Sequence, residues 1–179
     1  MTSTSPIIIV DIDSTLSDPS FRLHHLFPNK ENGEKKNWGA FFREAKNDPP
    51  IPAMVKIYKI FYTLGYDLRV VTGRPEHLRF DTLTWFEQYG MPLKTENLFM
   101  RSNSDRRPDF LVKEDALRSW EVPVEKIFCA FEDRLQVVAM WKSFGIPVFV
   151  CGNDYEDSSN FLKFREEKER LERKGSSYS

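Results

Sequence analysis

The sequence predicts an α/β domain in which helices flank a doubly wound parallel sheet. Short, continuously apolar segments alternate along the chain with longer segments whose apolar residues recur at helical spacing. Continuous apolar runs are typical of strands buried on both faces of a parallel sheet. Alternation of such strands with helices is typical of the doubly wound arrangement. The 179 residues suffice for one domain with a hydrophobic core and a small appendage.

The predicted elements follow one another in a regular order. Five apolar segments predict strands: 7–10, 68–71, 97–100, 126–131 and 147–150. Four amphipathic segments predict helices between them: 55–64, 78–89, 111–120 and 137–144. Gly65, Gly90 and Gly145 stand directly after three of these helices, where glycine commonly ends a helix.

Two regions depart from this alternation. Residues 17–50 are long and polar, with one short helical pattern at Trp38, Phe41 and Phe42. A structureless loop of that length is uncommon inside a compact domain, so we expect a small cap that folds over the strand ends and selects the substrate. Residues 152–179 form the other region, with a charged, solvated helix predicted at 161–174 and a disordered end after it. The main domain is therefore predicted to span 6–151, with the cap inserted at 17–50.

Composition excludes several classes of protein. Lys and Arg total 26 and Asp and Glu total 27, so a protein that acts mainly as a polycation is excluded, although a local basic groove is not. Cys129 and Cys151 lie in apolar runs outside any C-x-x-C pair, which predicts buried thiols in a reducing compartment. No apolar run approaches the ~20 residues of a membrane span, and no signal-peptide pattern is seen. We expect a cytoplasmic protein without membrane contact, and we infer no obligate protein partner.

Two carboxylates follow the first predicted strand. Asp11 and Asp13 stand at i and i+2, so both side chains point to one site if the backbone stays extended. In open parallel sheets, ligands bind at the carboxyl ends of the strands. Adjacent carboxylates require a compensating cation, for which Mg²⁺ with oxygen ligands is suited. One carboxylate could attack phosphorus while the other carries a proton. The plain alternative is an Asp-rich turn at the end of a strand.

Three further groups follow later elements. The turn Thr72-Gly73-Arg74 offers a hydroxyl, backbone N–H groups and a guanidinium that can hold an oxyanion. Lys113, near the start of a predicted helix, can neutralise a phosphoryl group during transfer. Glu132 and Asp133 end a strand and add oxygen ligands at the same sheet edge. Their plain alternatives are an ordinary turn, a surface lysine and a helix N-cap.

In this order, the four groups resemble motifs I to IV of the haloacid dehalogenase (HAD) superfamily of aspartyl-phosphate hydrolases. The run Asp11-Ile12-Asp13-Ser14-Thr15-Leu16 resembles the D-x-D-x-T-L loop, and Glu132-Asp133 resembles the acidic fourth motif. Thr72 and Lys113 match the hydroxyl and lysine of motifs II and III. The resemblance implies a HAD-like, Rossmannoid sheet with a small cap insertion after the first strand.

Over about residues 6–151 the chain also resembles the 3'-phosphatase domain of phage-type polynucleotide kinase/phosphatase. The runs GYDLRVVTGRPE, R-x-x-x-D-x-R-x-D-x-x-x-K (101–113) and FEDRLQVVAMWKSFGI carry this resemblance. It implies that Asp11 is the nucleophile and Asp13 the general acid/base. It also implies four phosphate-binding side chains: Thr72, Arg74, Arg101 and Lys113. Mg²⁺ would be bound by Asp11, Asp133 and the main-chain carbonyl of Asp13, with Glu132 as a further candidate ligand.

The chain departs from the family pattern in three ways. Ser14 stands where most members have Gly, so the turn there must accept a Cβ atom. The fourth motif is Glu-Asp rather than Asp-Asp. There is no G-x-x-x-x-G-K-[ST] motif, so we expect no kinase half in these 179 residues.

The expected function is that of a Mg²⁺-dependent phosphomonoesterase which forms an aspartyl-phosphate, with the 3'-phosphate end of a nucleic acid as substrate. A nucleoside monophosphatase is the alternative among enzymes. Outside enzymes, the alternatives are a phosphorylatable receiver-type domain, whose acceptor Asp lies on a later strand, and a non-catalytic module of the same fold. A nucleic-acid substrate favours a basic rim, and the candidates, which could equally form a solvated loop, are Arg22, His24, His25, Lys30, Lys35 and Lys36.

Overall fold

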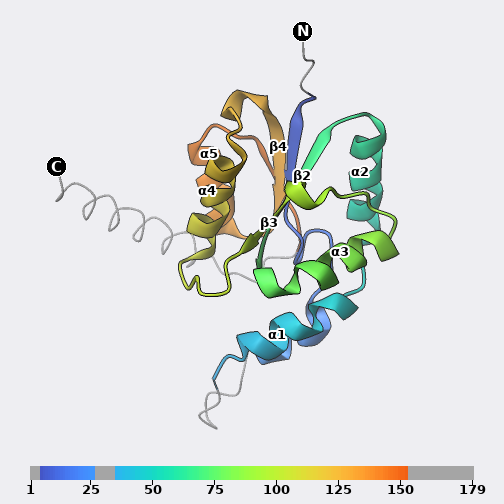
Figure 1. Ribbon diagram of the computed structural model, residues 1–179, viewed down its shortest axis with the longest axis vertical. Coiled ribbons are helices and arrows are strands. Elements are labelled where there is room, and N and C mark those ends of the chain that lie inside the picture. The colour runs from blue at the N-terminus through green and yellow to red at the C-terminus, as the bar shows by residue number, and fades with distance from the viewer. Residues whose placement is uncertain (1–4, 27–34, 153–179) are drawn as a thin grey trace, which may run out of the picture.

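Parallel strands form the centre of the molecule, in the order β3-β2-β1-β4-β5 (Figure 1). The computed structural model describes residues 5–26 and 35–152. The strands are β1 (Ile7–Val10), β2 (Asp67–Pro75), β3 (Leu98–Arg101), β4 (Ile127–Glu132) and β5 (Val148–Val150). All five predicted strands are therefore confirmed, and all of their pairings are parallel.

Helices cover both faces of this sheet, as the alternating pattern predicts. On one face lie α2 (Pro52–Thr63) and α3 (Arg79–Gln88), and on the other lie α4 (Asp109–Trp120) and α5 (Leu135–Ser143). A further helix, α1 (Trp38–Glu44), lies beyond the ends of the strands (Figure 1). Gly65, Gly90 and Gly145 have positive φ angles and follow α2, α3 and α5, which confirms their predicted place at helix ends. The predicted helix at 161–174 lies outside the described residues. No helix in 5–26 or 35–152 is long and apolar enough to cross a membrane.

Two apolar clusters fill the space between sheet and helices. Ile8 and Val10 of β1 pack with side chains of α2 and α3, whereas Ile7 and Ile9 pack with those of α4 and α5. All four residues are buried because β1 is the central strand. Cys129 on β4 is buried, as predicted, but Cys151 is only half-buried because it follows the edge strand β5.

The segment 17–50 leaves and rejoins the sheet at its carboxyl edge. Ser17 and Pro50 pair in an antiparallel bridge, and the Asp18 N–H donates to the Pro49 carbonyl at 2.9 Å. Between these ends lie the 3₁₀ helix η1 (Ser20–His25), the helix α1 and the 3₁₀ helix η3 (Ala45–Asn47). The short helix predicted around Trp38 is thus confirmed. Figure 1 shows α1 beyond the ends of the strands, which positions it beside any site at that edge.

Candidate active site

The side chain of Asp11 lies at the carboxyl edge of the sheet, between β1 and β4. Its N–H donates to the Phe131 carbonyl at 3.0 Å, so strand-like pairing continues one residue past β1. The Lys113 ammonium lies 2.6 Å from Oδ1 of Asp11 and 2.8 Å from Oε2 of Glu132. Lys113 is only 1% exposed, so it is not a surface lysine. The structure thus brings together three predicted site residues from β1, α4 and β4.

Asp11, Glu132 and Asp133 form an acidic cluster with the composition of a cation site. One ligand atom from each lies within 4.8 Å of the others. Among the described residues, Oδ1 of Asp133 is one of few buried side-chain atoms without a hydrogen-bond partner. Three carboxylates face one ammonium, and hard divalent cations prefer such oxygen ligands. The residues present therefore fit a Mg²⁺ ion.

Burial and the excess of negative charge both shift the pKa values of this cluster. Burial raises the pKa of Asp11 to about 8, against the attraction of Lys113, and the charges of Glu132 and Asp13 add to the rise. Burial and the charges of Asp11 and Glu132 likewise raise the pKa of Asp133 well above its ordinary value. A bound divalent cation would lower both pKa values, since it favours the ionised carboxylates.

The carboxylate of Asp13 faces two arginines rather than the acidic cluster. Its Oδ1 accepts from Nη2 of Arg74 and from Nη2 of Arg22, each at 2.6 Å. Both guanidinium groups also bind Asp48, at 2.5 Å from Arg22 and 3.1 Å from Arg74. Burial alone would raise the pKa of Asp13, but the charges of Arg74 and Arg22 lower it below its ordinary value. We call Asp13, Arg22, Asp48 and Arg74 the arginine network.

Arg22 corrects one prediction made from the sequence. It was expected on an exposed basic rim, but its side chain is 0% exposed. Its guanidinium carbon lies 4.0 Å from the centroid of the Phe41 ring, and Nη1 donates to the Phe41 carbonyl at 3.2 Å. Burial is possible because the carboxylates of Asp13 and Asp48 neutralise the charge.

The other rim candidates differ in exposure. His24, Lys35 and Lys36 are exposed. His25 is half-buried, with Nε2 3.0 Å from Glu44. Lys30 lies outside the described residues.

Thr72, Gly73 and Arg74 were predicted as a turn but lie in the last part of β2, where the register with β3 shifts, and close contacts hold this segment. The buried Oγ1 of Thr72 accepts from the Arg74 N–H at 3.2 Å. A Cβ atom on Gly73 would lie 2.6 Å from Oδ1 of Asp109, so the close approach of Asp109 requires glycine. Arg101 donates to the Gly73 carbonyl at 3.3 Å and to Asp109 at 2.9 Å. Arg101 therefore braces the end of β2, while its predicted contact with phosphate, like that of Arg74, stays a prediction.

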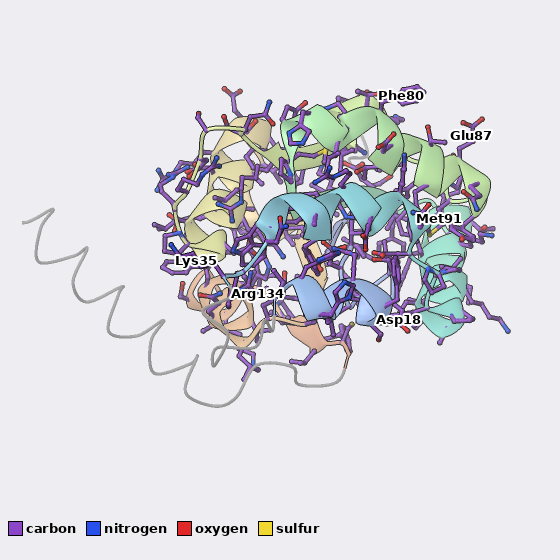
Figure 2. The ribbon with its side chains drawn as sticks, turned by 90° about the horizontal axis from the view of Figure 1, so that it is seen from below. Asp18, Lys35, Phe80, Glu87, Met91 and Arg134 are labelled. Atoms are coloured by element: carbon purple, nitrogen blue, oxygen red, sulfur yellow. The ribbon has the colours of Figure 1, made fainter. Side chains whose placement is uncertain are left out.

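The roles of two residues at the site were missed from the sequence, and the structure explains one departure from the family pattern. Asp48 was not singled out, because a lone Asp before Pro is an ordinary turn residue. Asp109 was expected only at a helix start, where it does begin α4, and its contacts with Arg101 and Gly73 were missed. Ser14 has φ 68°, so the loop does adopt the left-handed backbone for which the family uses Gly. Figure 2 looks onto this edge of the sheet: η1 lies between the labelled residues Arg134 and Asp18, and α1 crosses the view between Lys35 and Met91.

Comparison with known proteins agrees with this geometry. The family described as the polynucleotide kinase PNKP phosphatase domain matches residues 5–155. A viral protein named as a bifunctional polynucleotide kinase/RNA ligase, from Autographa californica nuclear polyhedrosis virus, is 25% identical over 149 residues. That alignment covers 83% of this chain and 20% of the viral protein.

Solved structures show the same fold. A chain in the structure of a Pnkp1/Rnl/Hen1 complex has a TM-score of 0.63 and 25% identity, with 84% of this chain and 48% of that chain covered. The class C acid phosphatase from Bacillus anthracis has a TM-score of 0.60 and 18% identity, with 93% and 80% covered. This chain thus spans about a fifth to a half of the length of its relatives that are 25% identical.

These matches decide between the classes considered above. The family match spans most of the chain and favours a phosphatase over a receiver-type domain. The chain belongs to the family of polynucleotide kinase phosphatase domains, and it is a phosphatase of the HAD fold.

Proposed function

We propose that this phosphatase is a Mg²⁺-dependent phosphomonoesterase that acts through an aspartyl-phosphate on Asp11. The observation that carries the proposal is the buried Asp11 carboxylate, which lies against Lys113 and among two further carboxylates at the carboxyl ends of β1 and β4. None of these charged side chains belongs to the two apolar clusters that form the hydrophobic core. Buried groups with shifted pKa values are typical of reaction centres.

Asp11 and Lys113 supply the nucleophile and a positive charge. Lys113 holds Oδ1 of Asp11, which leaves the other carboxylate oxygen to attack phosphorus. The same ammonium, held also by Glu132, neutralises charge on the phosphoryl group during transfer. Mg²⁺, held by Asp11, Asp133 and the Asp13 carbonyl with Glu132 as a further candidate, would supply Lewis-acid stabilisation of the phosphoryl oxygens.

Asp13 carries the proton. It protonates the leaving alkoxide in the first step and removes a proton from water in the second. The arginine network holds Asp13 as a carboxylate, which is the form that the second step uses. An anionic phosphate that binds Arg74 would weaken its pair with Asp13 and so allow Asp13 to take up a proton.

We propose the 3'-phosphate end of a nucleic acid as the substrate. The family of the chain supports this choice, and its viral relative is named for a polynucleotide kinase and RNA ligase. The segment 17–50 would act as the cap that selects the substrate, on a main domain of residues 6–151. A related chain is part of a Pnkp1/Rnl/Hen1 complex, so we do not propose that this protein works without partners.

A substrate panel tests the proposal. The panel contains 3'- and 5'-phosphorylated oligonucleotides, nucleoside 3'- and 5'-monophosphates and an aryl phosphate, each with and without Mg²⁺. We expect Mg²⁺-dependent release of phosphate, fastest from the 3'-phosphorylated oligonucleotide. Preference for the monophosphates would support a nucleotidase instead.

Two variants test the nucleophile. Asp11→Asn should abolish turnover on every substrate, because an amide cannot attack phosphorus. Asp67→Asn is the matched control, since Asp67 starts β2 at the opposite edge of the sheet. More than a few percent of activity in Asp11→Asn would contradict the covalent mechanism.

A further inference from the structure

Three aromatic side chains form a cluster on α1. Trp38 stacks on Phe42 with ring centroids 5.7 Å apart and an interplanar angle of 26°. Phe41 meets both rings edge-on and is 5% exposed. Trp38 remains 45% exposed, even though it contacts both of these aromatic rings. Phe41 therefore anchors the cluster, and Phe42 supports an indole that remains open to solvent.

This cluster is joined directly to the arginine network. The Arg22 guanidinium, which binds Asp13, lies 4.0 Å from the Phe41 centroid, and Phe41 lies 5.8 Å from Trp38, which places the indole within roughly 10 Å of that guanidinium. The same guanidinium donates to Oδ1 of Asp13 at 2.6 Å, and Asp13 is the residue proposed to protonate the leaving group. One chain of contacts therefore links the exposed indole to the acid/base: Trp38 to Phe41, Phe41 to Arg22 and Arg22 to Asp13.

The chemistry beside the indole fits a nucleotide. The Lys36 ammonium lies 5.8 Å from the centroid of the Trp38 ring, and Lys35 next to it is exposed. An aromatic face with flanking cations is the combination that single-stranded nucleic-acid sites use, because every base has a π face and every linkage has a phosphate. A ligand without a planar ring would gain little from this arrangement.

We infer that Trp38, with Lys36 beside it, is a stacking subsite for the nucleobase next to the phosphate that is hydrolysed. The inference rests on the proposed function, since it requires a phosphate bound at Asp11. The base stacks on the indole while the sugar spans the distance to the catalytic site. The subsite then favours substrates with a base and leaves hydrolysis of small aryl phosphates unaffected.

The kinetic experiment combines variants with substrates. The variants are Trp38→Ala and Trp38→Phe, with Phe128→Ala as control, because Phe128 is 51% exposed but lies near the start of β4, at the opposite edge. The substrates are a 3'-phosphorylated oligonucleotide, the same oligonucleotide with an abasic 3'-terminal nucleotide, and an aryl phosphate. Trp38→Ala should lower kcat/KM for the intact oligonucleotide about tenfold, which corresponds to about 1.4 kcal/mol.

Comparison between substrates isolates the stacking contact. For the abasic substrate, kcat/KM should be low in the wild type and no lower in Trp38→Ala, since the base that would stack on Trp38 is already missing. Trp38→Phe should retain most of the activity, and kcat/KM for the aryl phosphate should stay within about twofold in all variants. Equal kcat/KM for the intact oligonucleotide in wild type and Trp38→Ala would overturn the subsite while leaving the proposed function intact.

A binding measurement gives a readout without turnover. The Asp11→Asn variant is titrated with the intact oligonucleotide, and tryptophan emission is recorded. Trp85 and Trp141 are buried, and Trp120 is half-buried at the end of α4, where its indole donates to the Glu96 carbonyl before the start of β3. Quenching by a base on the exposed Trp38 should therefore disappear when Trp38→Phe is added to the variant. Quenching that persists in the double variant would overturn the subsite. A wild type that hydrolyses the aryl phosphate but no oligonucleotide or nucleotide would instead overturn the proposed substrate, and the subsite with it.

Discussion

Removal of the Arg22 side chain should destabilise the protein far more than removal of an exposed arginine. Arg22 binds Asp48 through Nε at 2.7 Å and Nη2 at 2.5 Å, and it binds Asp13 at 2.6 Å. Arg22→Ala leaves the fully buried Asp48 with Ser17 and one arm of Arg74 as side-chain partners. Breaking a buried pair costs about 3–5 kcal/mol, because the remaining charge is left uncompensated.

The loss can be measured by urea denaturation. Trp85 donates to the Asp48 carbonyl at 2.8 Å, so its emission reports on unfolding next to the altered residue. Arg118→Ala is the control: Arg118 is 74% exposed and pairs with Glu114 on the same helix, so we expect a change within about 0.5 kcal/mol. With a total stability of about 5–15 kcal/mol, the Arg22→Ala loss would be a large fraction of it.

A double-variant cycle with Asp48→Asn sharpens this test. Once Arg22 is absent, neutralising Asp48 should lower the free energy of unfolding less than it does in the wild type. The double variant should therefore lose less stability than the sum of the losses in Arg22→Ala and Asp48→Asn. A free energy of unfolding for Arg22→Ala within about 1 kcal/mol of the wild type would refute the reasoning. Additive losses in the double variant would show that Arg22 and Asp48 act separately.

Three other predictions concern the active site. Gly73→Ala should lower phosphatase activity sharply, because the added Cβ would lie 2.6 Å from Oδ1 of Asp109. The control Gly39→Ala on α1 should be tolerated, and equal activities of the two variants would contradict this prediction. In the metal-free protein, the free energy of unfolding should fall as pH rises from 3.8 to about 8, because the folded state keeps a proton on Asp11 that the unfolded chain has released. Added Mg²⁺ should therefore raise Tm more at pH 8 than at pH 6, and a Tm shift independent of pH would argue against the cluster as the metal site. Asp13→Asn should slow hydrolysis of alkyl phosphates more than that of aryl phosphates, since a phenolate leaves without a proton; equal losses would give Asp13 a structural role.

The strands and helices could be predicted because each depends on local sequence. Apolar runs defined the strands, and glycines with positive φ ended three of the helices. The end of β2 was missed, since it continues to Pro75 rather than stopping at Val71. The polar residues after Val71 looked like a turn, yet Pro75 still pairs with Arg101 of β3.

The acidic cluster could be predicted, but the arginine network could not. Asp11 follows β1 and Glu132 ends the neighbouring strand β4, and strand ends meet at one edge of a parallel sheet. Arg22 and Asp48 are 26 residues apart in a polar region with only one short helical pattern, and their pairing depends on how that region folds back. A buried arginine is uncommon, so an exposed position was the reasonable expectation from sequence.

Acid-quench mass spectrometry of the Asp13→Asn variant tests the central role of Asp11 most directly. With an aryl phosphate, the first step needs no proton from residue 13, but the second step needs a base to activate water. We therefore predict that a phosphoryl group accumulates on the peptide that contains Asp11, and that it is absent when Asp11→Asn is added. Turnover of the aryl phosphate without any phosphorylated peptide, or with the phosphoryl group on another residue, would contradict Asp11 as the nucleophile.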